Sequence, residues 1–128
     1  MKFELENTTL EVEENQILSN ADVYSFIQNI HNNEEDFIDG DLGKRIDLYN
    51  EFICKKIPFS KLVYDFFSYD EDIVDEYAEL ETETPPLFVS EYLNGNYFVE
   101  DGTHRCRALE RQEDCENLLV WCFVPCRK

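Results

Sequence analysis

The sequence predicts a mixed α+β domain, and three observations support this fold class. Between Phe52 and Val124, strand-forming runs alternate with amphipathic helical patterns in the order strand, helix, β-hairpin, helix, strand. The length of 128 residues suits one domain with its own core. Hydrophobic residues make up 43% of the chain and aromatic residues 14%, which excludes the disordered class. We therefore expect a single domain, with residues 52–124 as its core and residues 1–51 as an N-terminal extension packed on it.

The N-terminal extension contains patterns for a strand and two helices. Residues 2–18 alternate between apolar and polar side chains only in part, which favours a strand or a hairpin. A helix is expected to start at Ser19 or Asn20, because apolar residues follow at helical spacing: Val23, Phe26, Ile27 and Ile30. Asp41 is expected to cap a second, shorter helix.

The core region contains a hairpin between two helical patterns. Residues 52–57 predict a strand that stops at Pro58, and an acidic helix is expected to start at Ser68 or Asp70. The hairpin spans residues 87–100, where Asn94-Gly95 is the favoured two-residue turn because both positions tolerate positive φ. A helix is expected to follow Asp101-Gly102-Thr103, and residues 118–124 predict the last strand.

The chain is strongly acidic, which limits its partners. Asp and Glu number 29 and Lys and Arg number 11, so the formal net charge is −18. Such a surface repels phosphate backbones, so we expect no direct nucleic-acid binding and no membrane binding. The longest apolar run, residues 118–124, is too short for a membrane span, and the first residues lack a secretory pattern. The five cysteines are therefore expected to be reduced thiols in a cytoplasmic protein.

The positive charges are concentrated in one place. No lysine or arginine occurs between Leu62 and His104, and then Arg105, Arg107 and Arg111 follow within a short segment. A phosphate at this helix start would meet unpaired backbone N–H groups, a hydroxyl and guanidinium groups. The alternative is that the arginines pair with nearby acids and that the residues before them only cap the helix.

The segment Gly102-Thr103-His104-Arg105-Cys106-Arg107-Ala108 resembles a junction of the ParB/sulfiredoxin superfamily. Many members read Asp-Gly-X-His-Arg between the hairpin and the next helix, and ParB-type partition proteins read Gly-Glu-Arg-Arg-X-Arg-Ala. The resemblance spans about residues 52–124, and its specific motifs lie within residues 86–108. It implies a ParB/sulfiredoxin-like core with an added N-terminal element.

The resemblance also implies a nucleotide site that uses Mg²⁺ with ATP or CTP. The nucleotide-binding residues it implies are Gly102, Thr103, His104, Arg105 and Arg107, with Arg105 as the favoured direct ligand. Asp101 would be a catalytic carboxylate and the metal ligand, and Asp65 would be the second carboxylate that free-serine kinases of the superfamily place upstream.

Two other branches of the superfamily fit the chain less well. Sulfiredoxins carry a cysteine immediately before the histidine, where this chain has Thr103, so sulfinic-acid repair is not expected. ParB partition proteins also carry a helix-turn-helix domain for DNA, and we expect no such domain within these 128 residues.

Two functions stay open at this point. One is a small nucleotide-binding protein that acts as a Mg²⁺-dependent phosphotransferase or nucleotide hydrolase. The other is a nonenzymatic acidic interaction protein, such as an inhibitor, an immunity protein or a nucleic-acid mimic, that binds a basic protein partner. The net charge favours the second function, because it repels a nucleotide unless Mg²⁺ or the arginines reverse the field locally.

Overall fold

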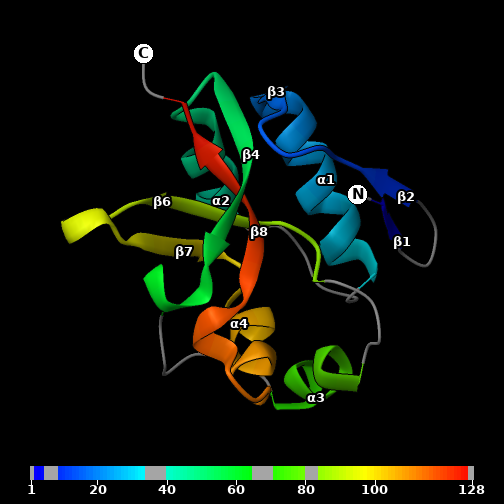
Figure 1. Cartoon of the computed structure of the whole chain (residues 1–128). Helices are drawn as coiled ribbons and strands as arrows, with labels where there is room; N and C mark the ends of the chain where they lie inside the picture. The colour runs from blue at the N-terminus through cyan, green and yellow to red at the C-terminus, as the bar shows by residue number, and fades with distance from the viewer. Residues whose placement is uncertain (1, 5–8, 34–39, 65–70, 80–83, 127–128) are drawn as a thin grey trace.

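A six-stranded sheet organises the molecule (Figure 1). The computed structural model describes residues 2–4, 9–33, 40–64, 71–79 and 84–126. The strand order is β3-β4-β8-β6-β7-β5, and β1 and β2 form a separate antiparallel pair. The strands are β1 (Lys2–Glu4), β2 (Thr9–Glu11), β3 (Ile17–Ser19), β4 (Glu51–Pro58), β5 (Leu62–Val63), β6 (Leu87–Glu91), β7 (Tyr97–Asp101) and β8 (Leu119–Pro125).

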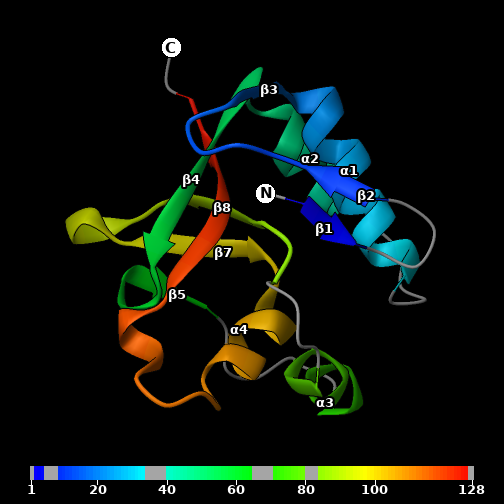
Figure 2. The same cartoon turned by 45° about the vertical axis from the view of Figure 1, so that its right-hand side comes forward.

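Helices lie on both faces of the sheet. They are α1 (Asn20–Asn33), α2 (Gly40–Asp47), α3 (Glu71–Glu79) and α4 (Thr103–Leu109). Figures 1 and 2 show α1 and α2 in the upper half of the molecule and α3 beside α4 in the lower half. The mixed α+β class predicted from the sequence is confirmed. No helix within the described residues is long and apolar enough to cross a membrane.

Two buried clusters lie on opposite faces of the sheet, because successive side chains of a strand point to opposite sides. Along β8, Trp121 and Phe123 belong to the first cluster, while Val120 and Cys122 belong to the second. The first cluster also contains Phe3 of β1 and side chains of β3, α1 and α2, and the second contains side chains of α4. The N-terminal residues thus pack on the core, and they also add strand β3 to the main sheet beside β4.

The expected elements correspond to observed ones with three differences. Helix α2 begins at Gly40, so Asp41 lies inside this helix and does not cap it. The hairpin between β6 and β7 forms, and Asn94 and Gly95 both have positive φ as expected (60° and 78°). Its connection is longer than two residues, because the Tyr92 N–H donates to the Asn96 carbonyl at 2.9 Å around a 3₁₀ turn. Strand β5, which pairs in parallel with β7, has no counterpart in the expectation. The expected helix starts at Ser68 and Asp70 lie outside the described residues.

Candidate functional site

The site predicted from the sequence lies at the turn between β7 and α4. Asp101 ends β7, Gly102 adopts a left-handed conformation with φ of 119°, and Thr103 begins α4. A Cβ atom at Gly102 would lie 2.4 Å from Leu87 Cδ2 and 3.0 Å from Arg105 Nη2. Glycine is therefore required here both for its backbone conformation and for space.

A buried ion pair holds this turn from the inside. Arg105 Nη2 donates to Asp101 Oδ2 at 3.0 Å, and Arg105 Nη1 donates to the carbonyls of Pro85 at 2.9 Å and Pro86 at 3.0 Å. Arg105 is only 2% exposed and Asp101 9%. The guanidinium thus ties the start of α4 to the end of β7 and to the segment before β6. Buried charges persist in folded proteins when they are paired in this way.

This arrangement differs from the roles expected for Arg105 and Asp101. A side chain that is 2% exposed and makes three internal hydrogen bonds has little surface to offer a phosphate. Arg105 is buried because its position in the helix places it on the inner face of α4, together with Cys106, Ala108 and Leu109. The Asp101 carboxylate likewise forms an ion pair with the guanidinium of Arg105, which lies four residues later in the chain. In this conformation both residues act as an anchor of the turn.

The outer face of α4 carries the other expected ligands. Thr103, His104 and Arg107 are all half-buried. Residues three or four apart on a helix share a face, so Arg107 lies beside both Thr103 and His104. The expected nucleotide-binding residues are therefore divided between two faces, with Arg105 inside and these three outside.

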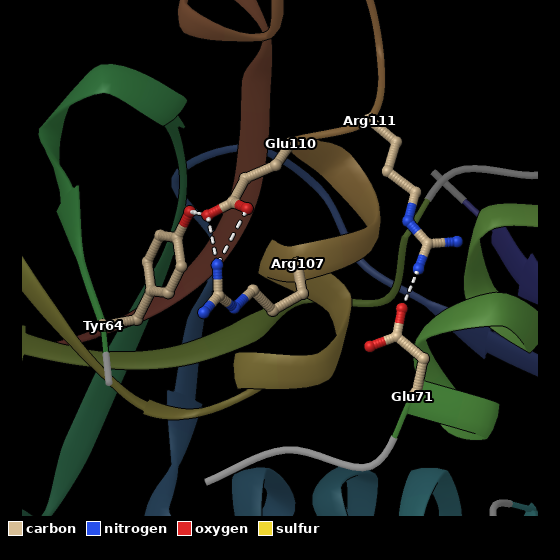
Figure 3. A network of polar contacts seen from close by, with 5 residues as sticks. All are labelled: Tyr64, Glu71, Arg107, Glu110 and Arg111. Carbon is tan, nitrogen blue, oxygen red and sulfur yellow. Dashed lines mark hydrogen bonds and ion pairs between the residues drawn. The ribbon is translucent and has the colours of Figure 1, made fainter. Parts of the chain in front are cut away.

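A second polar network occupies the outer face of α4 (Figure 3). Arg107 Nη1 donates to Glu110 Oε2 at 3.1 Å and lies 3.5 Å from Oε1 of the same carboxylate. The buried hydroxyl of Tyr64 donates to Glu110 Oε1. Burial and this hydrogen bond raise the pKa of Tyr64 well above its ordinary value, so the hydroxyl stays protonated. Neither Tyr64 nor Glu110 is among the site residues that the sequence predicts.

Arg111, just beyond the end of α4, connects this helix to α3. Its guanidinium pairs with Glu71 at 2.6 Å and with Asp75 at 2.7 Å, and Figure 3 shows it turned away from Arg107. Together with the pair between Arg45 and Glu100, every arginine in the described residues pairs with a carboxylate. The alternative expectation, that the arginines pair with nearby acids, is confirmed for these residues.

The remaining site expectations concern metals and thiols. Within the described residues, no three His, Cys, Asp or Glu side chains gather in a way that could hold a metal ion. Asp65, the expected second carboxylate, lies outside the described residues. All five cysteines are free thiols. Burial raises the pKa of Cys54 to about 11 and that of Cys106 to about 12, which makes these two thiols poor nucleophiles at neutral pH.

Comparison with known proteins gives a match among solved structures. No family model and no curated protein matches the sequence. Sulfiredoxin from Arabidopsis thaliana matches with a TM-score of 0.44 and 22% sequence identity, over 59% of this chain and 84% of that chain. This likeness is one of fold, so the roles of the residues must follow from their own contacts.

Proposed function

We propose that the chain binds a nucleotide through its phosphates on the outer face of α4. Thr103, His104 and Arg107 would supply the donors. The observation that carries this proposal is their placement on one helix face, next to a turn that is held rigid from behind. A hydroxyl, an imidazole and a guanidinium are all groups that donate hydrogen bonds to phosphate oxygens. The guanidinium is also suited to a planar, two-point contact with phosphate.

The buried anchor supports this site without touching the ligand. Arg105 fixes Asp101 and the carbonyls of Pro85 and Pro86, so the Gly102 turn has little freedom to move. Binding groups contribute most when their supporting residues are already ordered before the ligand arrives. Asp101 and Arg105 would then be positioning residues, and Thr103, His104 and Arg107 the ligand contacts.

The described residues do not fit a Mg²⁺ ion held by the protein. The carboxylate expected as metal ligand, Asp101, pairs with Arg105 in the interior. The proposed function therefore includes no metal ion held by protein side chains. ATP and CTP, each supplied with Mg²⁺, remain the ligands to test, and phosphoryl transfer or hydrolysis would require the Asp101 carboxylate to leave Arg105.

The proposal is tested by calorimetric titration of ATP and CTP with Mg²⁺ into the wild type, Arg107→Ala and Arg111→Ala. A lost hydrogen bond between charged groups weakens binding by about tenfold or more, so we expect this for Arg107→Ala. Arg111→Ala removes the same charge from a position paired with α3, and we expect it to bind like the wild type. The absence of binding by the wild type, or equal losses in both variants, would contradict the proposal.

A second function is favoured by the charge of the molecule. The net charge is −18, and the arginines of the described residues are neutralised by carboxylates. An acidic interaction protein would use this field to attract a basic protein partner. The calorimetric titration described above separates the two functions. An acidic interaction protein need not bind a nucleotide, so Arg107→Ala and Arg111→Ala would then have the same effect on the titration.

A further inference from the structure

We infer that Glu110 is an internal competitor of the phosphate for Arg107, and that Tyr64 holds the Glu110 carboxylate ready to release this arginine. The inference rests on the proposed function, because it concerns the regulation of the same binding face. It assigns roles to two residues that sequence reasoning left out of the site.

From one helix face Arg107 can reach the Glu110 carboxylate and the proposed phosphate position beside Thr103. Glu110 lies three residues after it and Thr103 four residues before it, so both neighbour Arg107 on α4. In the structure the guanidinium pairs with Glu110, with a closest distance of 3.1 Å. Side chains of an α-helix normally lean toward its N-terminus, so a rotation of Arg107 toward Thr103 follows an ordinary rotamer.

The pair between Arg107 and Glu110 is partly shielded from solvent. The Arg107 side chain is 18% exposed and that of Glu110 is 31% exposed. Shielding strengthens an ion pair relative to a fully exposed one, whose contribution is close to zero. A phosphate that binds Arg107 must therefore displace the Glu110 carboxylate. The observed affinity for the phosphate is lowered by the fraction of molecules in which Arg107 is paired with Glu110 and not available.

Tyr64 keeps the carboxylate satisfied during this exchange. Its buried hydroxyl donates to Glu110 Oε1, while Arg107 donates at 3.1 Å to Oε2. When Arg107 leaves, Glu110 retains the hydrogen bond from Tyr64 and its own solvent contact. The desolvation cost of an orphaned carboxylate is thereby reduced, and the release of Arg107 becomes less costly.

The test compares Glu110→Gln with Asp75→Asn by titration with the Mg²⁺ complexes of ATP and CTP. Glutamine keeps an acceptor for Tyr64 but removes the charge that competes for Arg107, so we expect affinity to rise about fivefold. Asp75→Asn removes the same charge beside Arg111 on the other side of α4. We expect it to change affinity by less than about twofold, because screening weakens its effect at Arg107.

Two further variants separate competition from a merely structural role. In the Arg107→Ala background, Glu110→Gln should leave affinity unchanged, because no guanidinium remains to be released. Tyr64→Phe should lower affinity, opposite in sign to Glu110→Gln, because Glu110 then loses the partner that replaces Arg107. Thermal melting of each variant confirms that the fold is retained.

The outcomes distinguish this inference from the proposed function. Measurable wild-type binding that is unchanged in Glu110→Gln, or raised as much in Asp75→Asn, overturns the inference and leaves the nucleotide site standing. A rise in affinity in Tyr64→Phe also overturns it. If the wild type and every variant fail to bind, the proposed function fails with it.

Discussion

Asp101 and Arg105 form the residue pair on which the turn before α4 depends. Both side chains are almost fully buried, and Arg105 Nη2 donates to Asp101 Oδ2 at 3.0 Å. A charge buried in this way is tolerated because its partner compensates for the lost solvent. Removing one member therefore leaves the other uncompensated, which is more damaging than losing an exposed ion pair.

This pairing makes Asp101→Asn a discriminating substitution. We expect it to lower the free energy of unfolding by about 3 kcal/mol, because the Arg105 charge loses its buried counter-ion. A residue that only capped the helix would lose a few tenths of a kcal/mol. Urea denaturation at neutral pH measures the difference. A variant as stable as the wild type would show that the anchor is unimportant.

Gly102 is the other residue that the turn requires. Gly102→Ala adds a Cβ atom 2.4 Å from Leu87 Cδ2 at a φ of 119°, so both a clash and backbone strain follow. We expect a loss of about 3 kcal/mol in unfolding free energy.

Gly95→Ala is the matched control for this substitution. Gly95 also has positive φ, at 78°, but nothing lies within 4 Å of its Cβ position. Backbone strain alone predicts a loss of about 1 kcal/mol there. Equal losses in the two variants would mean that the contact with Leu87 does not matter.

At the scale of the elements, α4 shows what sequence reasoning could and could not predict. The glycine, the helix and the hairpin before it follow from local patterns, and the structure contains all three. The inward position of Arg105 was also encoded locally, because it falls on the same helical stripe as Cys106 and Leu109. Its positive charge made an outward ligand the more obvious interpretation.

Other features depend on contacts between distant parts of the chain. Tyr64 and Glu110 are 46 residues apart, and no local pattern relates a strand-end tyrosine to a helix-end glutamate. Strand β5 has two residues, too few for an alternating pattern to show. Strand β3 joins the main sheet only because it meets β4, so residues 1–51 could be predicted to pack on the core but not to extend its sheet.

At the scale of the whole molecule, buried thiols and Tyr64 predict a loss of stability in alkaline solution. Burial raises the pKa of Cys54 to about 11 and of Cys106 to about 12, from an ordinary value of 9.0, and it also raises the pKa values of Cys122 and Tyr64. The three thiols stay protonated in the folded chain above pH 9.0 but ionise in the unfolded chain, and the Tyr64 hydroxyl does the same above pH 10.0. The unfolded state then binds fewer protons, so its relative free energy falls as pH rises.

These groups should therefore leave the free energy of unfolding independent of pH below about pH 8. Above about pH 9 the free energy of unfolding should decline, by up to ~1.4 kcal/mol per group and pH unit. Urea denaturation under reducing conditions measures this decline. Cys54→Ala should make it shallower, after allowance for the cavity that the substitution creates. Equal stability at about pH 8 and about pH 10 would contradict the burial of these thiols.

The charge of the molecule limits how a nucleotide can bind. With a net charge of −18, long-range forces oppose the approach of a polyphosphate, and only a local arrangement of donors can overcome them. In the proposed function the outer face of α4 would supply these donors, whereas Arg105 is buried and bonded in the interior. The proposed function therefore requires that α4 have two faces, an outer one that binds phosphate and an inner one that anchors the turn.

Side-chain NMR of the arginines tests whether the outer face of α4 binds the nucleotide while the inner face stays anchored. In a titration with the Mg²⁺ complexes of ATP and CTP, the Arg107 Nε signal and the backbone amides of Thr103 and His104 should shift and saturate together. The Arg105 Nε signal should stay in place, because its guanidinium remains bound to Asp101 and to the proline carbonyls. No saturable shift with either nucleotide, or a shift that is largest at Arg105, would contradict the account.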